Sequence, residues 1–175
     1  MSTKLTYFDI YGRGETIRLL LTHAKVEFED NLISREQLPE LKSTGVLEFG
    51  QVPLLQKDGL NLVQSLSILR YLGTQLGYYP ADAEQAYFVD VTLEGIEDFI
   101  GKFFRPVFEQ DAEKKAAYIQ QLVEHVPKTV GMIQHRLSNN ESKLHVVGNT
   151  TTIADIALAN VYFSMVTNPA YPFAE

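Results

Sequence analysis

The stretch KLTYFDIYGRGETIRLLL, residues 4–21, reads as an apolar strand, a turn with two glycines and the start of a helix. It places Tyr7 and Arg13 at one strand-to-helix turn. A phenol donates a hydrogen bond to an anion, and a nearby guanidinium favours the charged form of a bound group. The pair is therefore suited to holding a thiolate, although a strand tyrosine is more often a half-buried core aromatic and a turn arginine is usually solvated.

The two glycines of this turn, Gly12 and Gly14, are expected to allow the positive φ angles of a sharp turn. They also suggest a dinucleotide-binding fingerprint. That fingerprint needs a third glycine at position 17, where the chain has Ile17, so a phosphate-binding turn is excluded.

The composition narrows the possible partners. The 175 residues, 45% of them hydrophobic, are enough for one or two compact domains. A net charge of −7 disfavours nucleic acid and anionic membranes. The chain has no cysteine, so disulfides are excluded and any thiol chemistry needs a thiol carried by a ligand. Neither an apolar signal core nor a run of about 18 apolar residues occurs, which predicts a cytoplasmic protein without a membrane span.

The hydrophobic pattern predicts two domains, at 1–75 and 82–175, joined by a linker at 76–81 that contains glycine and proline. In the first, the order of elements is βαβ followed by ββα, with a hairpin turn at Asp58-Gly59. The expected strands cover 4–8, 27–33, 52–56 and 60–63, and the expected helices 15–24, 38–42 and 65–75.

The second domain is expected to be helical throughout, with segments at about 83–104, 112–137 and from 152 into the 160s. Pro127 should kink the middle helix. Thr152 and Asp155 form a pair that resembles a capping box at the start of the last helix. Asp155 is therefore interpreted as a structural residue rather than an acid catalyst.

A second informative cluster is Gln51-Val52-Pro53, in which proline favours an extended Val52. A cis peptide bond before Pro53 would leave the backbone of Val52 as an edge for an extended peptide. A trans bond is the commoner state of such a pair, so the residues alone leave both open.

The pair Gln64-Ser65 ends a hairpin and begins a helix, with Ser65 expected at the N-cap. Ile68 stands where a glutamate would complete a capping box, so the first-turn amides are available to an external carboxylate. An ordinary N-cap is the alternative. A phenol for a thiol, a backbone edge for a peptide and a helix end for a carboxylate together describe a site for a small thiol peptide.

With these motifs the chain resembles a cytosolic glutathione transferase, and within that family it is most similar to the sigma class. The motifs that carry the resemblance are Tyr7-Phe8, Gly12-Arg13-Gly14-Glu15-x-x-Arg18, Gln51-Val52-Pro53, Asp58-Gly59, Gln64-Ser65 and Gly148-x-x-x-Thr152-x-Ala154-Asp155. They span nearly the whole chain. The resemblance implies an α/β thioredoxin-like N-terminal domain (βαβ-ββα) followed by an all-α helical-bundle C-terminal domain.

The resemblance also implies a glutathione site, with glutathione as co-substrate and no metal. Tyr7 would bind the sulfur with support from Arg13, and Lys42 would meet the glycyl carboxylate. The remaining implied contacts are Gln51 beside the ligand, Val52 on the cysteinyl backbone, a cis Pro53, Gln64 and Ser65 at the γ-glutamyl end, and Asp98 from the partner of a homodimer.

An electrophile pocket is expected beside Tyr7. Its predicted lining is Phe8, Ile10, Gly12, Phe104, Arg105 and Tyr162. An apolar lining with a few polar groups suits hydrophobic electrophiles, and Arg105 would bind an acidic tail or else stay in solvent.

The chain departs from the family pattern in two places. Leu38 stands where sigma enzymes often have a tryptophan that donates to the glycyl end, and leucine cannot donate. The chain also ends earlier than is usual in the family, so the helical domain is expected to lack the final helices.

Glu94, Glu97 and Asp98 share one helix face by their spacing, which allows a solvated face or a divalent-cation site, and the resemblance implies that this face looks into a dimer cleft. The solvated face is the commonest outcome of such a charge run. The four histidines, His23, His125, His135 and His145, lack ligand spacing and are interpreted as structural or surface residues.

Two functions follow. The favoured one is a glutathione transferase that detoxifies hydrophobic electrophiles, with isomerase (including prostaglandin isomerase) or peroxidase activity as variants. The alternative is a non-catalytic carrier or structural protein similar to the S-crystallins. Tyr7, Arg13, Gln64 and Ser65 favour the enzyme, whereas Leu38 and the short C-terminus favour the alternative.

Overall fold

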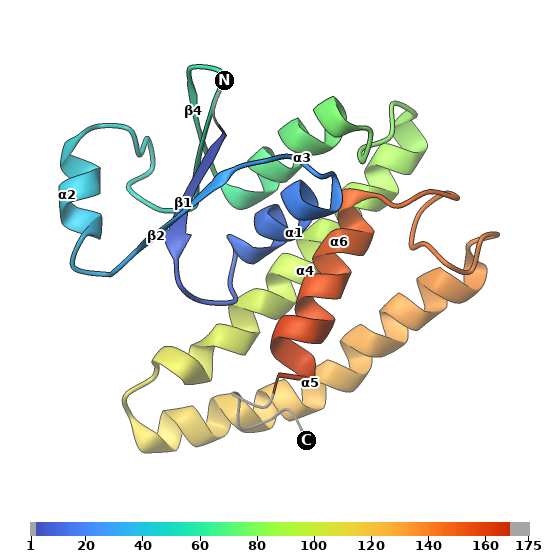
Figure 1. Ribbon diagram of the computed structural model, residues 1–175. Helices are drawn as coiled ribbons and strands as arrows, with labels where there is room; N and C mark the ends of the chain where they lie inside the picture. Colours follow the sequence, from blue (N-terminus) through green and yellow to red (C-terminus); the bar gives the residue numbers. More distant parts are fainter. Residues whose placement is uncertain (1–2, 169–175) are drawn as a thin grey trace. The chain divides into compact units, whose positions relative to one another are not determined.

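The structure is a computed structural model that describes residues 3–168 (Figure 1). The chain divides into two compact units, Met1–Tyr78 and Tyr79–Glu175. The first unit combines a sheet with three helices, and the described part of the second is helical. This confirms the expected order of a mixed α/β domain followed by a helical one.

The sheet of the first unit has four strands in the order β2-β1-β3-β4. Strand β1 pairs in parallel with β2 and antiparallel with β3, and β3 pairs antiparallel with β4. The strands are β1 (Lys4–Phe8), β2 (Glu29–Ile33), β3 (Leu54–Lys57) and β4 (Leu60–Val63), and the helices are α1 (Glu15–His23), α2 (Leu38–Ser43) and α3 (Ser65–Leu76). The predicted hairpin between β3 and β4 is confirmed, since Asp58 and Gly59 have φ angles of 53° and 81°.

The core of the first unit is formed by buried side chains of the central strands and of helices α1 and α3. Central strands β1 and β3 bury Leu5 and Leu55 completely. Helices α1 and α3 contact each other, and each buries a stripe with i, i+3 or i+4 spacing. Those stripes are Ile17, Leu20 and Leu21 on α1 and Ile68, Leu69 and Leu72 on α3. The buried core places β1, and with it Tyr7, at the centre of the sheet.

The second unit is built on two long helices, α4 (Ala83–Phe108) and α5 (Ala112–Asn139). Helix α4 packs against both α5 and the shorter α6 (Ile153–Val161), which continues into a π-helical segment, η1 (Tyr162–Val166). The predicted capping box of α6 is confirmed: Asp155 accepts from the Thr152 amide at 2.8 Å. Its other carboxylate oxygen accepts from the Val146 amide at 2.9 Å, so Asp155 also ties the preceding loop to the helix.

Several expected element boundaries differ from the structure, and three of them have consequences for the packing or the site. Helix α4 continues past Pro106 to Phe108, because Pro106 is buried and the Phe104 and Phe108 rings stack across that turn at 5.8 Å. Strand β3 begins at Leu54, after Val52 and Pro53, because a proline lacks the ladder donor. The strand expected from residue 27 begins at Glu29.

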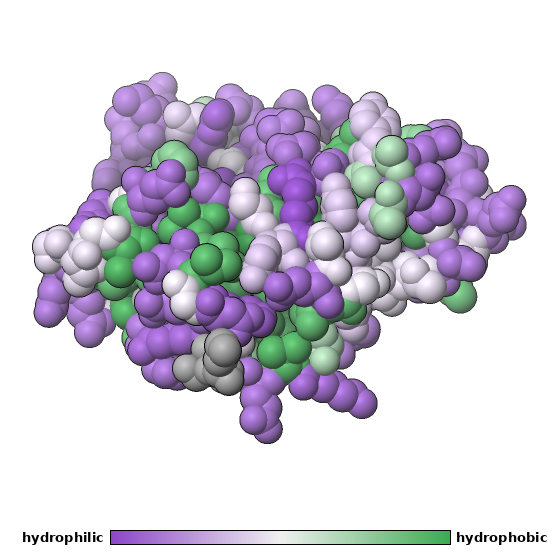
Figure 2. Space-filling view, turned by 90° about the horizontal axis from the view of Figure 1, so that it is seen from above, coloured by the Kyte–Doolittle hydropathy of each residue, from purple (hydrophilic) through white to green (hydrophobic). Residues whose placement is uncertain are grey.

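Two other features concern surfaces. Between residues 3 and 168, none of the helices combines the length and the apolar character that crossing a bilayer requires. Figure 2 shows apolar residues reaching the surface among hydrophilic ones. Exposed large apolar side chains include Phe49, Tyr87, Val123 and Phe163.

Candidate functional site

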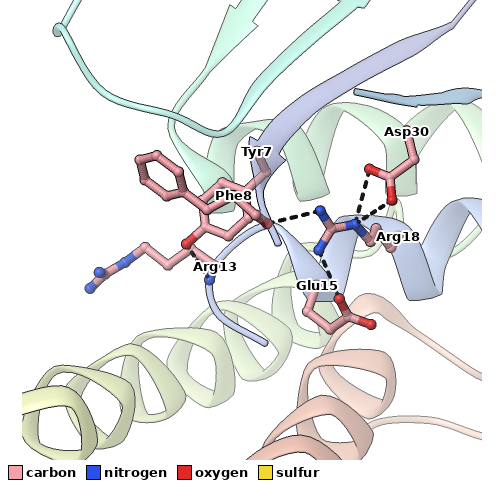
Figure 3. Close-up of polar contacts among 6 residues, drawn as sticks. All are labelled: Tyr7, Phe8, Arg13, Glu15, Arg18 and Asp30. Atoms are coloured by element: carbon pink, nitrogen blue, oxygen red, sulfur yellow. Dashed lines mark hydrogen bonds and ion pairs between the residues drawn. The ribbon is translucent and has the colours of Figure 1, made fainter. Parts of the chain in front are cut away.

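The phenol of Tyr7 is held by the turn that follows its strand. Tyr7 is 6% exposed on β1, and the backbone amide of Arg13 donates to its hydroxyl at 3.1 Å (Figure 3). The structure therefore brings Tyr7 and Arg13 together through the Arg13 backbone. Figure 3 shows the Arg13 side chain extending away from Arg18, on the other side of the Tyr7 ring.

The two glycines of the turn have a different role from the one expected. Neither Gly12 nor Gly14 is among the residues with positive φ. Both are needed for close approach instead: a Cβ on Gly12 would lie 2.7 Å from the Tyr7 hydroxyl, and one on Gly14 would lie 2.5 Å from Cγ of the ring. The turn therefore packs its backbone directly against the Tyr7 ring, and only glycine leaves the space.

Opposing influences act on the Tyr7 hydroxyl. Burial raises the pKa of Tyr7, whereas the Arg13 amide, the Arg13 charge, the Gly14 amide and the Arg18 charge lower it. Burial dominates, so the pKa of Tyr7 lies above its ordinary value of 10.0. The phenol is therefore neutral near pH 7 and keeps a proton to donate while its oxygen accepts from Arg13.

Arg18 holds the turn from the other side, a role that the sequence did not assign. Its side chain is 13% exposed and bonds to Glu15 at 2.9 Å and, through Nε, to Asp30 at 2.9 Å (Figure 3). It also donates to the carbonyl oxygen of Phe8 at 3.2 Å, and its guanidinium carbon lies 5.8 Å from the Tyr7 ring centroid. The i, i+3 spacing of Glu15 and Arg18 could have predicted their ion pair from the sequence. Asp30 lies on β2, so its contact with Arg18 could not be predicted from spacing along α1.

Strand register brings three predicted site residues to one end of the sheet. Thr6 pairs with Leu54, and Leu54 pairs with Val63. The next residues along each strand are Tyr7, Pro53 and Gln64. Since β1 is antiparallel to β3, and β3 to β4, Tyr7 in β1, Pro53 just before β3 and Gln64 just after β4 lie at the same end of the sheet.

The peptide bond between Val52 and Pro53 is cis, the alternative that the family resemblance implied. Pro53 is buried, Val52 is half-buried and Gln51 is exposed. Val52 lies before β3 rather than within it. Its backbone is thus outside the strand ladder, at the end of the sheet where Tyr7 lies.

The first turn of α3 follows directly from this sheet end. Ser65 is the first helical residue and Gln64 is the N-cap, so the expectation of Ser65 at the N-cap is wrong. Gln64 has a φ of 68°, a conformation uncommon outside glycine, and is the last residue before the helix. The N-cap makes no side-chain bond and the first turn carries no acidic residue, so its amides suit an external carboxylate.

Two further predicted residues lie on or near α2. Lys42, in its last turn, is exposed, and its side chain runs beside Gly50: a Cβ on Gly50 would lie 3.7 Å from Lys42 Cε. This places the ammonium next to the segment that leads to Gln51. Leu38 is the first residue of α2 and is half-buried.

The predicted electrophile pocket draws on residues of both units and stays a prediction. In the first unit, Phe8 is half-buried and Ile10 is 40% exposed. In the second, Phe104 is half-buried, Tyr162 is 53% exposed on η1, and Arg105 lines a cavity formed by α4 and α5.

The acidic residues of α4 lie on an accessible face. Glu94 and Asp98 are exposed and Glu97 is half-buried. Across the described residues, no three or more His, Asp or Glu side chains are grouped as metal ligands would be. The groups that the geometry brings together in the first unit are a neutral phenol, a sheet end and a helix start without a side-chain cap.

Comparison with known proteins assigns the family. Residues 3–74 match the glutathione S-transferase N-terminal domain, and residues 97–174 match the glutathione S-transferase C-terminal domain. Glutathione S-transferase A of Cavia porcellus is 35% identical over 161 residues, which cover 91% of this chain and 73% of the relative.

Solved structures agree with this assignment. Prostaglandin synthase D of Nilaparvata lugens superimposes with a TM-score of 0.84 at 33% identity, covering 95% of this chain and 82% of the other. Na-GST-3 of Necator americanus, a glutathione S-transferase described as monomeric, gives a TM-score of 0.82 at 29% identity and covers 99% and 88%. The chain belongs to the cytosolic glutathione S-transferase family.

Proposed function

We propose that this chain binds glutathione and activates its thiol for attack on hydrophobic electrophiles. The observation that carries the proposal is the buried, neutral phenol of Tyr7, supported by the Arg13 amide at the sheet end that also presents Pro53 and Gln64. Membership of the family supports the same activity. The comparisons add no support for the non-catalytic alternative.

The chemistry of the thiol sets what Tyr7 must supply. A free thiol has a pKa of about 8.5, so only about 3% is thiolate at pH 7. A hydrogen bond from a neutral phenol stabilises the thiolate more than the thiol, and each unit of pKa depression corresponds to about 1.4 kcal/mol. One such bond with positive surroundings supplies roughly one to two units. The protein activates and positions the nucleophile, while the nucleophile itself is the ligand's sulfur.

The remaining contacts to glutathione follow the tripeptide from the sulfur outward. The backbone of Val52 pairs with the cysteinyl unit and Gln51 flanks it. Gln64, Ser65 and the first-turn amides of α3 take the γ-glutamyl carboxylate, which an uncapped helix N-terminus favours. Lys42 meets the glycyl carboxylate, and its position beside Gly50 supports this contact. Asp98 of a second copy completes the site at the ligand's amine.

The finer assignments belong to the same proposal. The chain is a sigma-class enzyme and a homodimer that acts in detoxification in the cytoplasm, with domains at 1–75 and 82–175 and a linker at 76–81. Its electrophile pocket is lined by Phe8, Ile10, Gly12, Phe104, Arg105 and Tyr162. The likeness to a prostaglandin synthase D supports isomerase chemistry as one use of the activated thiol.

Paired variants test the proposal. Replacing Tyr7→Phe removes the donor and should lower turnover about 10- to 100-fold, while glutathione still binds. Replacing Ser65→Ala should mainly raise the Michaelis constant for glutathione, because Ser65 begins the helix that holds the γ-glutamyl end. Calorimetric titration with glutathione and a chlorodinitrobenzene conjugation assay measure the two quantities separately. Unchanged turnover in Tyr7→Phe, or a pure loss of turnover in Ser65→Ala, would contradict these roles.

A further inference from the structure

A cavity of about 220 Å³ lies between the two long helices of the second unit. It is lined from both α4 and α5 and contains no residue of the first unit. Its lining consists of Lys102, Arg105, Tyr118, Gln121, Leu122, Glu124, His125 and Lys128. Of these lining residues, Arg105 alone also belongs to the proposed electrophile pocket, and the proposed glutathione contacts use none of them.

The charge of the cavity is opposite to that of the chain. Three cationic side chains, Lys102, Arg105 and Lys128, face a single carboxylate, that of Glu124. Glu124 already accepts from the Gln120 side chain at 2.9 Å. Within the part of the chain that the structure describes, none of the ion pairs involves the three cations. Positive charge thus gathers at this cavity without an ion-pair partner among the described residues, although the chain has a net charge of −7.

His125 lies among these cations and responds to them. Its Nε2 is 3.1 Å from Lys102 Nζ, where the ammonium donates and the neutral ring accepts. Its ring stacks on Phe99 at 6.4 Å between centroids. Burial, followed by the charges of Lys102 and Lys128, lowers the pKa of His125, and only Asp98 opposes this. The lowered pKa favours the neutral ring near pH 7, and a bound anion that offsets the lysines would favour the protonated ring, which has a second donor.

We propose that this cavity binds a small tetrahedral oxyanion with two negative charges, of the phosphate or sulfate type. Guanidinium and ammonium groups are the side chains that recognise such oxyanions by charge-assisted hydrogen bonds. Three of them, converging from two helices, match a dianion better than a monoanion. The volume suits a head group rather than a large aromatic ligand, because drug-sized pockets begin at about 300 Å³.

The direct test is a titration of the purified chain with inorganic phosphate and, separately, inorganic sulfate. Ionic strength is held constant with sodium chloride, since surface cations respond to salt alone. Replacing Lys128→Gln, and separately Arg105→Gln, should weaken binding about 10-fold by removing one charge-assisted hydrogen bond. The matched control is Lys143→Gln, which removes the same charge from an exposed loop residue outside the cavity lining and should leave affinity unchanged.

A second readout uses His125 itself. Nuclear magnetic resonance can follow the four histidines between about pH 5 and 8, with sulfate as a probe whose charge stays constant. The charged groups that act on His125 are Lys102 and Asp98 from α4 and Lys128 from α5, and the other titratable residues that line the cavity are Arg105, Tyr118 and Glu124. Sulfate bound among them should raise the pKa of His125 and leave His23, His135 and His145 where they were. This shift should disappear in Lys128→Gln.

The two anions also identify the natural source. Tighter binding of phosphate assigns the cavity to phosphate esters, and equal or tighter binding of sulfate assigns it to sulfate or sulfonate groups. Either result supports the proposal. Weakening by Lys143→Gln equal to that by Lys128→Gln, or an unchanged His125 pKa at saturating sulfate, would overturn it. Circular dichroism of each variant checks that the helices are intact.

Discussion

Tyr7 shows how the position and protonation of one side chain are set by its neighbours. Its ring occupies space that Gly12 and Gly14 leave open, and its oxygen is held by the Arg13 amide. Arg18 ties the end of the same strand to Glu15 and Asp30. A hydroxyl positioned by backbone and packing keeps its proton for a ligand.

Substituting Gly14→Ala tests whether close approach is the reason for the glycine. The new methyl group would overlap the Tyr7 ring, so the ring must move. We expect turnover to fall about 10-fold and the free energy of unfolding to fall by about 1 to 3 kcal/mol, as in an overpacked core. Conjugation kinetics and urea denaturation measure these effects.

The control for this substitution is Gly131→Ala, in the middle of α5, where a Cβ would meet no atom within 4 Å. This change should raise the free energy of unfolding by about 0.5 to 1 kcal/mol, since glycine is a poor helix residue. If Gly14→Ala were equally harmless, the packing role of Gly14 would be wrong.

The pH dependence of activity separates the phenol from the thiol. Because the pKa of Tyr7 is raised above 10.0, the phenol stays protonated through the neutral range. The acid limb of kcat/KM should therefore report the bound thiol and lie below about pH 8.5. In Tyr7→Phe this limb should move upward, toward the value of a free thiol. A limb that stays in place would show that another group lowers the pKa of the thiol.

At the scale of elements, caps and helix ends decide where the chain changes direction. The start of α3 is left without a side-chain cap, which suits it to a ligand. The start of α6 is capped as fully as a helix allows, with Asp155 accepting from both the Thr152 amide and its hydroxyl. The start of α3 is thus available to the carboxylate of a ligand, whereas the start of α6 is already capped by the carboxylate of Asp155.

Replacing Asp155→Ala should destabilise the protein more than removal of an ordinary cap. It leaves the amides of Val146 and Thr152 without their acceptor in a part-buried setting. We expect a loss of about 2 to 3 kcal/mol in the free energy of unfolding. The comparison is Asp82→Ala at the exposed start of α4, where a single bond to the Gln85 amide is lost and about 1 kcal/mol is expected. Urea denaturation with an unchanged slope would measure both, and equal losses would contradict the loop-tying role of Asp155.

At the scale of the whole molecule, surface character bears on assembly. Tyr87 is 61% exposed on α4, close in sequence to the exposed Phe88 and Val91. Apolar side chains that reach the surface in groups mark interaction sites. The proposed homodimer would cover these side chains. Because a relative, Na-GST-3, is described as monomeric, whether this chain dimerises must be measured.

Sedimentation velocity decides the assembly. The chain of 19.8 kDa should sediment as a dimer, and Tyr87→Glu should shift it toward the monomer because a charge would have to be desolvated in the interface. Lys143→Glu changes the charge in the same direction at another exposed position and should leave the dimer intact. A single species of monomer mass at all concentrations would show that Asp98 cannot act from a partner.

Local pattern was enough to predict much of this protein. The strand with Tyr7, the Asp58-Gly59 turn and the capping box at Thr152 and Asp155 all depend on residues within a few positions of one another. The spacing of apolar residues likewise defined the helices of both units. Such features follow from backbone preferences and from contacts along one element, which the order of residues already contains.

Other features were decided only by tertiary packing. Gly12 and Gly14 are needed because the Tyr7 ring packs against their backbone. Asp30 on β2 comes close to Arg18 only when β2 pairs with β1. Helix α4 passes Pro106 because its buried face stabilises the extra turn. His125 joins three cations from two helices, although the spacing of the histidines suggested no site. Each of these features depends on distances between residues in the folded structure. Burial and strand register determine those distances, and the local sequence does not.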